Sequence, residues 1–373
     1  TEFVLRAISM KDVELLSLQE KLKSRSKNIH QKTVKPKVER GVVFRNKSNT
    51  YCISLLLLLF LLPFLSCSKV GSQTPVVIGI NTWTGYDPLI LAESKNLFQK
   101  NNVNVEIKRY GSAQEEMQAM RNGVLYGAAL TMDEAVSLHE SGCPVKAVLV
   151  IDYSMGGDML IGQKSITDMQ SLKAKKIGYE GTVVGEFLLQ RALKANNIKE
   201  WEVKLIEVKA ENWLTTFREH GVDAMVCYNP TSTILLNRYE GNLLFSSKDI
   251  PFEIIDILVF SESFFHSNKS AIVKVAKTWF EALEYINGNP DEASEIITSE
   301  KQITLAEFKQ GLSGLIAPDL KTNKNIFNSE YDNNIYKYSQ VIIDFMMSEG
   351  LLSGRLNTDD FFDSSIVSTL DKL

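Results

Sequence analysis

Residues Val76 to Leu91 read VVIGINTWTGYDPLIL, a short β-branched run that is followed by a polar turn and then by the start of a helix. The same order repeats, because Val103 to Tyr110 and Tyr126 to Leu130 also read as strands, and a helical pattern follows each of them. Strands that alternate with helices are typical of βα units around a largely parallel sheet. The pattern therefore predicts an α/β fold.

A second set of short strands follows the glycine pair Gly156-Gly157, and the chain then returns through an apolar run from Ile254 to Phe260. We interpret residues 75–153 and 257–373 as lobe 1 with C-terminal helices, and residues 154–256 as lobe 2. The predicted hinge residues are Ser154, Gly156, Gly157 and Asp256. A cleft between two such lobes is where a small ligand is expected.

Upstream of these lobes, an apolar run of about 13 residues from Ile53 to Leu65 ends in Ser66-Cys67. It is shorter than the roughly 20 residues that a membrane-spanning helix needs, so an export signal fits better. The sequence Phe64-Leu65-Ser66-Cys67 resembles a bacterial lipobox, which implies lipidation of Cys67, although Phe64 stands where leucine is usual. A cleaved secretory signal and an uncleaved anchor remain open. We interpret residues 1–50 as an extension outside the mature protein, 51–66 as the signal and 67–74 as a lipidated linker.

Charge and composition exclude several classes of function. With 41 basic and 45 acidic residues the net charge is -4, and no basic cluster lies downstream of the signal, so nucleic acid is not expected as a partner. The four histidines show no metal-ligand spacing, and no nucleophile motif occurs, so no catalytic residue, metal or cofactor is predicted. Cys143 and Cys227 are expected to be small buried residues, with a disulfide as the alternative.

The turns that follow the predicted strands carry the candidate ligand-binding residues, because the carboxyl ends of strands face the ligand in open α/β sheets. Trp83 and Tyr86 are candidates for stacking on the solute, and packing in the core is the alternative. Asp133 is a candidate for a polar contact, but Thr131 and Glu134 beside it also fit a helix capping box.

Further candidates lie at the first crossover and in lobe 2. Asp152 and Tyr153 come at the end of the fourth strand and Asp158 follows the glycine pair, and Asp152 or Asp158 either binds a ligand amine or satisfies backbone donors at the crossover. Gly181 and Thr182 open a helix in lobe 2, and Tyr228 ends a strand that would face them.

In order along the chain, five stretches carry a family resemblance: Ile78 to Leu89, Ala128 to Ala135, Val150 to Ser154, Gly178 to Gly185 and Asp223 to Pro230. Together they resemble ABC-transporter substrate-binding proteins of the nitrate/taurine/sulfonate and thiamine-precursor group. The resemblance implies a two-lobe periplasmic-binding-protein type II fold, with mixed sheets flanked by helices. It also implies a monomer that is exported, anchored to a membrane through its lipid, and paired with an ABC permease that takes up a small solute.

The charge of the turn motifs favours one class of solute. The turn motifs contain five acidic residues and neither lysine nor arginine, and a carboxylate that faces an ammonium or aminopyrimidine gains a charge-assisted hydrogen bond. This favours an amine or a pyrimidine-like compound. Two alternatives remain, a lipoprotein that reports its ligand to a membrane sensor and an enzyme similar to thiamine-pyrimidine synthases.

Overall fold

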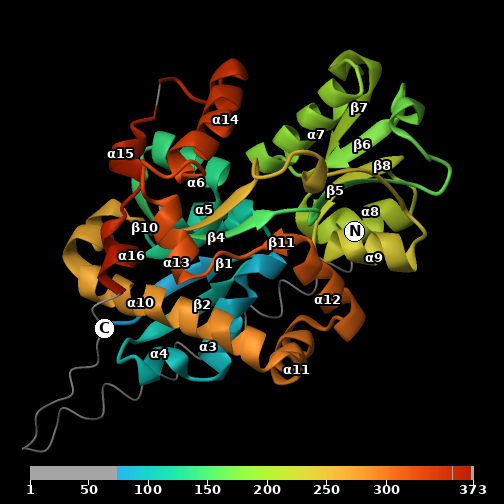
Figure 1. The fold of residues 1–373 in the computed structure, drawn as a ribbon. Helices are drawn as coiled ribbons and strands as arrows, with labels where there is room; N and C mark the ends of the chain where they lie inside the picture. The colour runs from blue at the N-terminus through green and yellow to red at the C-terminus, as the bar shows by residue number, and fades with distance from the viewer. Residues whose placement is uncertain (1–73, 355, 371–373) are drawn as a thin grey trace, which may run out of the picture. The chain divides into compact units, whose positions relative to one another are not determined.

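The structure, a computed structural model, describes residues 74–354 and 356–370 (Figure 1). Residues 72–373 form one compact unit. The predicted extension, the signal and Cys67 lie outside the described residues. In the part of the chain that is described, no helix combines the length and the apolar character needed to cross a bilayer.

Lobe 1 is built on a six-stranded mixed sheet in the order β11-β4-β10-β3-β1-β2. The strand β1 pairs in parallel with β2 and β3, whereas β10 runs antiparallel between β3 and β4. The return strand therefore lies in the middle of the sheet, next to the strand by which the chain leaves. The strands are β1 (Val76–Ile80), β2 (Val105–Arg109), β3 (Gly127–Thr131), β4 (Val145–Ser154), β10 (Ile255–Ser261) and β11 (Leu315–Ile316).

Helices cover both faces of this sheet because each presents an apolar stripe to it. Figure 1 shows α5 and α6 on one side of the sheet, and α3, α4 and α10 on the other. The long helix α10 is interrupted at Asn268, where the backbone leaves the helical region. The helical elements of lobe 1 are η2 (Thr84–Tyr86), α3 (Asp87–Ser94), α4 (Leu97–Lys100), α5 (Ala113–Arg121), α6 (Met132–Glu140), α10 (Glu262–Gly288), α11 (Pro290–Lys301), α12 (Leu305–Ser313), α13 (Leu320–Ile326), α14 (Ile335–Ser348), α15 (Thr358–Phe361) and α16 (Ser365–Thr369).

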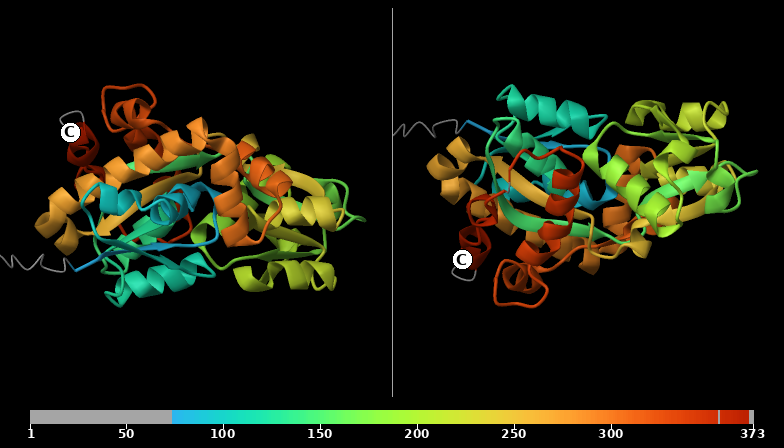
Figure 2. Two further views of the ribbon diagram at one scale, coloured as in Figure 1. Left: turned by 90° about the horizontal axis from the view of Figure 1, so that it is seen from below. Right: turned by 90° about the horizontal axis from the view of Figure 1, so that it is seen from above.

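Lobe 2 is built on a five-stranded mixed sheet in the order β7-β6-β8-β5-β9, in which β5 runs antiparallel to both of its neighbours. Its strands are β5 (Asp158–Gly162), β6 (Lys176–Tyr179), β7 (Lys204–Glu207), β8 (Ala224–Tyr228) and β9 (Asn242–Ser246). Its helices are η3 (Met169–Leu172), α7 (Val183–Ala195), η4 (Glu200–Glu202), η5 (Ala210–Asn212), α8 (Trp213–Arg218), α9 (Thr231–Arg238) and η6 (Ser247–Asp249). In both views of Figure 2 the orange helix α12 lies against this lobe.

Two crossing segments join the sheets, at residues 155–157 and 247–254. They are held together, because the Ser154 N–H donates to Ile254 O at 3.1 Å and the Ser154 and Ser247 hydroxyls lie 2.7 Å apart. Gly156 has a φ of 111°, a conformation that favours glycine. The predicted hinge residues Ser154, Gly156 and Gly157 are thus in or beside the first crossing, and movement about them stays a prediction.

The mixed sheets and flanking helices agree with the predicted fold class. The expectation of a largely parallel sheet was wrong for β4, β5, β9 and β10, because strands next to each crossing return beside their neighbours and pair antiparallel. Cys143 is half-buried and Cys227 is buried, and neither forms a disulfide.

Candidate functional site

The register of the sheets brings polar residues from distant parts of the chain to one edge. In lobe 1, Asp256 of β10 is paired with Asp152 of β4 on one side and with Thr131 of β3 on the other. In lobe 2, Asp158 of β5 is paired with Tyr228 of β8. Both sets lie where the sheets face each other across the crossings.

These residues surround a small space, which we call the inner cavity. It has a volume of about 20 Å³, which holds a water molecule and little more. Both lobes contribute to its lining, which comprises Asn81, Trp83, Tyr86, Thr131, Glu134, Asp158, Val184, Tyr228 and Asp256. A larger solute therefore requires the lobes to separate.

The aromatic residues of the inner cavity are also part of the core. Trp83 is 4% exposed and Tyr86 is 1% exposed. Trp83 Nε1 donates to Asp152 Oδ2 at 3.1 Å, and the Tyr86 hydroxyl lies 2.6 Å from Asp256 Oδ1. The Trp83 ring also meets Tyr228 edge to face, with centroids 6.0 Å apart. The two readings of Trp83 and Tyr86, as core residues and as lining of the ligand site, are therefore compatible.

A buried ion pair stabilises the turn that carries Trp83. Lys301, at the end of α11, pairs with Asp87, which is fully buried. The same ammonium group donates to Thr82 O at 3.2 Å and to Trp83 O at 3.3 Å. The Trp83 N–H donates to Asn81 Oδ1 at 2.9 Å. These bonds hold the turn in one conformation.

Seven buried carboxyl groups surround the inner cavity or lie directly behind it: Glu116, Asp133, Glu134, Asp152, Asp158, Glu180 and Asp256. Among the residues that line it, none is a lysine or an arginine. Burial therefore raises the pKa of Asp152 to about 8, of Asp133 and Glu180 to about 7 and of Asp158 to about 6.

The carboxyl groups also act on one another. Burial, followed by the charge of Asp152, raises the pKa of Asp256 well above its usual range. Burial and the charge of Asp133 do the same for Glu134. A site of this kind gains from a bound cation, because a positive charge stabilises the ionised carboxylates that burial disfavours.

A second space, which we call the outer groove, opens from the cleft between α5 and α6 of lobe 1 and the start of α7 in lobe 2. It has a volume of about 380 Å³ and shares Glu134 with the inner cavity. Gly181 and Thr182 line it, and Gln114 Nε2 donates to Gly181 O at 3.1 Å across the cleft. Glu134 thus lies between the outer groove and the inner cavity.

The predicted ligand residues divide into three groups. Trp83, Tyr86 and Tyr228 line the inner cavity, and Gly181 and Thr182 line the outer groove. Asp152 lies behind Trp83, and Asp133 is buried beside Thr131 and the Val184 backbone.

Tyr153 lies away from both spaces, because alternate residues of a strand point to opposite faces and Asp152 already points to the cleft. The placement of Tyr153 at the ligand cleft is therefore corrected.

Among the lining residues that were not predicted as ligand contacts are Asp256, Glu134 and Asn81. Asp256 was assigned to the hinge alone, yet it lines the inner cavity. Its signal in the sequence is a carboxylate inside the apolar run Ile254 to Phe260, since a buried charge needs a partner. Glu134 forms the expected cap, because the Thr131 N–H donates to its Oε2 at 2.9 Å, and it lines the cavity as well. Asn81 directly follows β1, in the same turn as Trp83, so its position was the available signal.

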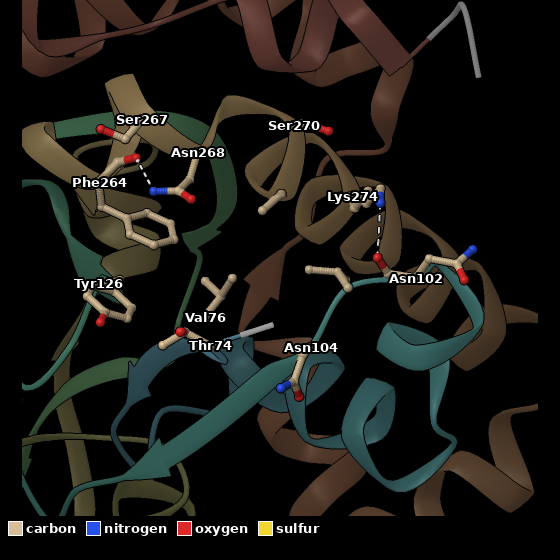
Figure 3. A pocket seen from close by; sticks show the side chains of 12 residues that line it. Thr74, Val76, Asn102, Asn104, Tyr126, Phe264, Ser267, Asn268, Ser270 and Lys274 are labelled. Carbon is tan, nitrogen blue, oxygen red and sulfur yellow. Dashed lines mark hydrogen bonds between the residues drawn. The ribbon is translucent and has the colours of Figure 1, made fainter. Parts of the chain in front are cut away.

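Elsewhere in the described chain the structure gives no metal centre, and a further hollow lies away from the inner cavity. No group of three or more histidine, cysteine or acidic side chains there is placed to hold a metal ion. Figure 3 shows a hollow of about 630 Å³ between the start of β1 and the Asn268 interruption of α10, where Tyr126 and Phe264 stack with centroids 4.6 Å apart. It lies at the amino-terminal edge of the sheet, opposite the inner cavity.

Comparison with known proteins agrees with this architecture. The model of the NMT1-like family matches residues 70–299. A putative binding protein of Brucella abortus is 22% identical over 314 residues, which cover 81% of this chain and 94% of that protein.

Two solved structures show the same fold. The zinc-bound ligand-binding component of an ABC-type import system from Staphylococcus aureus has a TM-score of 0.68 at 17% identity, covering 79% of this chain and 98% of that one. The alkanesulfonate-binding protein SsuA of Xanthomonas axonopodis pv. citri, bound to MOPS, has a TM-score of 0.66 at 13% identity, covering 79% and 100%. The predicted two-lobe periplasmic-binding-protein fold is thereby confirmed. Because the family model spans more than half of its residues, this chain belongs to the NMT1-like family.

Proposed function

We propose that this protein is an extracytoplasmic solute-binding protein of an ABC importer, and that its solute is a small cationic nitrogen compound, an amine or a pyrimidine-like base. The fold that it shares with the binding components of ABC importers supports the first part. The cluster of buried carboxyl groups at the inner cavity, with no basic side chain in its lining, carries the second part.

A cationic nitrogen compound fits the residues that face each other across the cleft. Its N–H groups would donate to Asp256 and Asp158, and a charge-assisted bond of this kind is about twice as strong as a neutral one. Trp83 and Tyr228 present aromatic rings, and a desolvated cation over such a ring gains roughly 2 kcal/mol. An anion such as the sulfonate of the Xanthomonas relative would instead meet carboxylates, which costs free energy.

Capture would proceed by closure of the lobes. With the lobes apart, the outer groove and the inner cavity become one space, into which the solute enters past Glu134. Closure then removes water and strengthens the attraction between the solute and the carboxylates. Because burial keeps part of the carboxyl cluster protonated near neutral pH, binding of a cation would release protons.

Delivery to a permease requires the protein to stay near a membrane. The lipobox-like sequence before Cys67 supports anchoring by a lipid at the periplasmic or outer cell surface. We propose that the protein binds its solute without chemical change and passes it to the permease. A membrane sensor as the receiver, and catalysis similar to that of thiamine-pyrimidine synthases, are the alternatives that the experiment below must distinguish.

The test is a thermal-shift screen of residues 72–373 against amines, aminopyrimidines, sulfonates, nitrate and bicarbonate. A solute at 100 times its dissociation constant adds about 2.7 kcal/mol to the free energy of unfolding. We expect stabilisation by cationic nitrogen compounds and recovery of the compound unchanged after incubation. Stabilisation by anions alone would overturn the proposed solute class, and conversion of the compound would support an enzyme.

Matched variants then locate the site. Trp83→Ala and Asp152→Asn should each weaken binding of the solute by about 1 to 3 kcal/mol, because Trp83 lines the inner cavity and Asp152 lies directly behind it. Asp332→Asn changes a carboxylate that is fully exposed to solvent, and it should leave the affinity unchanged. Equal affinity in wild type and both cleft variants would refute the assignment of the site.

A further inference from the structure

A further pocket, open to solvent on one side, lies behind the crossing segments, on the face of β4 that points away from the cleft. We call it the hinge pocket. It has a volume of about 380 Å³ and its principal walls are Tyr153, Phe252, Pro318, Ile326, Tyr331 and Tyr338. Asp152 and Tyr153 are neighbours in one strand, so the cleft and the hinge pocket lie on opposite faces of β4. The hinge pocket is therefore separate from the proposed solute site.

Three aromatic rings from three segments meet at this pocket. Tyr153 comes from the end of β4, Phe252 from the second crossing segment and Tyr338 from α14. Phe252 and Tyr338 are stacked, with centroids 5.5 Å apart and planes at 20°, whereas Tyr153 meets Phe252 edge to face at 5.3 Å. Such walls offer both the faces and the edges of rings, which are the geometries that a further aromatic ring prefers.

Polar residues in the lining of the hinge pocket include Asp319, Thr322 and Asn333, and the buried polar atom without a partner is the hydroxyl oxygen of Tyr153. The residue is 4% exposed, and its hydroxyl has no hydrogen-bond partner among the described residues. A buried hydroxyl without a partner loses its bonds to water and gains nothing in exchange. Burial also raises the pKa of Tyr153, so this group stays neutral and can donate. This oxygen has almost no surface open to solvent, so a ligand that displaces the side chains covering it and brings one hydrogen-bonding group to it would satisfy it.

The pocket is connected to both crossing segments. Phe252 has a φ of 65°, a strained conformation for a bulky residue, and strain of this kind clusters at ligand sites and switch regions. The next residue, Glu253, pairs with Arg191 of α7 at 2.6 Å, so lobe 2 holds this segment while Phe252 stacks on lobe 1. An occupant of the pocket would contact the chain where it passes between the lobes.

We propose that the hinge pocket is a second ligand-binding site, and that it takes a small neutral aromatic molecule with one hydroxyl or similar hydrogen-bonding group. The ring lies against Phe252 and Tyr338, and the polar group pairs with the Tyr153 hydroxyl. This proposal does not depend on the solute of the cleft, which is cationic and binds on the other face of β4.

The test compares two probes of nearly equal shape, p-cresol and p-xylene, which differ by a hydroxyl in place of a methyl group. Their binding to residues 72–373, the compact unit, is measured by titration in NMR spectra. We expect p-cresol to bind about 2- to 12-fold more tightly than p-xylene, which is the fold-change that one hydrogen bond of about 0.5 to 1.5 kcal/mol gives. Equal affinity for the two probes, or no binding of either, would overturn the proposal.

Two variants tie the probes to the pocket. Tyr153→Phe keeps the ring and removes the hydroxyl, so the preference for p-cresol should fall below twofold. Ala317→Trp adds a large side chain to the lining and should abolish binding of both probes. Undiminished preference in Tyr153→Phe would place p-cresol elsewhere and overturn the assignment, and this variant decides the matter even if Ala317→Trp does not fold.

Discussion

The buried carboxyl cluster predicts an unusual dependence of stability on pH, and Asp152 is the group on which it is best tested. Its side chain is fully buried, and burial raises its pKa from 3.8 to about 8. Between these two values the folded protein binds a proton that the unfolded chain releases. The stability of the protein should therefore decrease as the pH rises, which is opposite to the effect of a carboxylate in a salt bridge.

The size of the effect follows from the shift in pKa. Between pH 5 and pH 8 the single proton of Asp152 changes the free energy of unfolding by about 4 kcal/mol. For a chain of this length, that corresponds to a decrease in the melting temperature of roughly 8 °C. Asp133 and Glu180, whose pKa values are also raised, act in the same direction.

The assay is thermal unfolding of residues 72–373, followed by circular dichroism at pH 5 and pH 8. Asp152→Asn keeps the acceptor for Trp83 Nε1 but removes the ionisation, so about 4 kcal/mol of the difference between the two pH values should disappear. Asp332→Asn, at a fully exposed position, is the matched control and should leave the difference unchanged. If Asp152→Asn and wild type differ by less than about 1 kcal/mol in this dependence, the reasoning is refuted.

Two further predictions concern the turn and the crossing. Lys301→Met should destabilise the protein by about 3 to 5 kcal/mol in urea unfolding, because it leaves the buried Asp87 unpaired. Adding Asp87→Asn should restore part of this lost stability. If the double variant is no more stable than Lys301→Met, the role of the ion pair is contradicted. Gly157→Ala should hinder closure of the lobes, because an added Cβ would lie 2.3 Å from Trp83 Cη2. The control is Gly354→Ala, where nothing lies within 4 Å of an added Cβ. Equal radii of gyration of Gly157→Ala and wild type in X-ray scattering with solute would contradict this prediction.

Much of the fold could be predicted from the sequence, because its signals are local. Apolar β-branched runs such as Val76 to Ile80 mark buried strands, and the glycines near Gly156 mark the first crossing. The pairing of the strands could not be predicted in this way, because β10 pairs in the middle of its sheet although it lies more than a hundred residues downstream of β3 in the chain. The position of β10 in the sheet depends on packing between segments that are distant in the chain.

The residues of the site, like the fold, could be predicted only in part from local sequence patterns. Trp83 could be predicted because it lies in the turn that follows β1, and Tyr228 because it ends β8. Tyr153 could have been excluded by strand alternation alone, once Asp152 was assigned to the cleft. Asp256, in contrast, reaches the cavity because the antiparallel register pairs it with Asp152, and no local pattern specifies that register.

The bonds that Trp83 and Tyr86 make to Asp152 and Asp256 have a consequence for selectivity. The Trp83 indole N–H already donates to Asp152, and the Tyr86 hydroxyl already donates to Asp256. These two side chains therefore compete with an incoming molecule for the carboxyl oxygens. An incoming molecule must offer better donors than the two rings, or more of them, to be held. Under the proposed function, a molecule with a single weak donor should therefore bind less tightly than one with several donors.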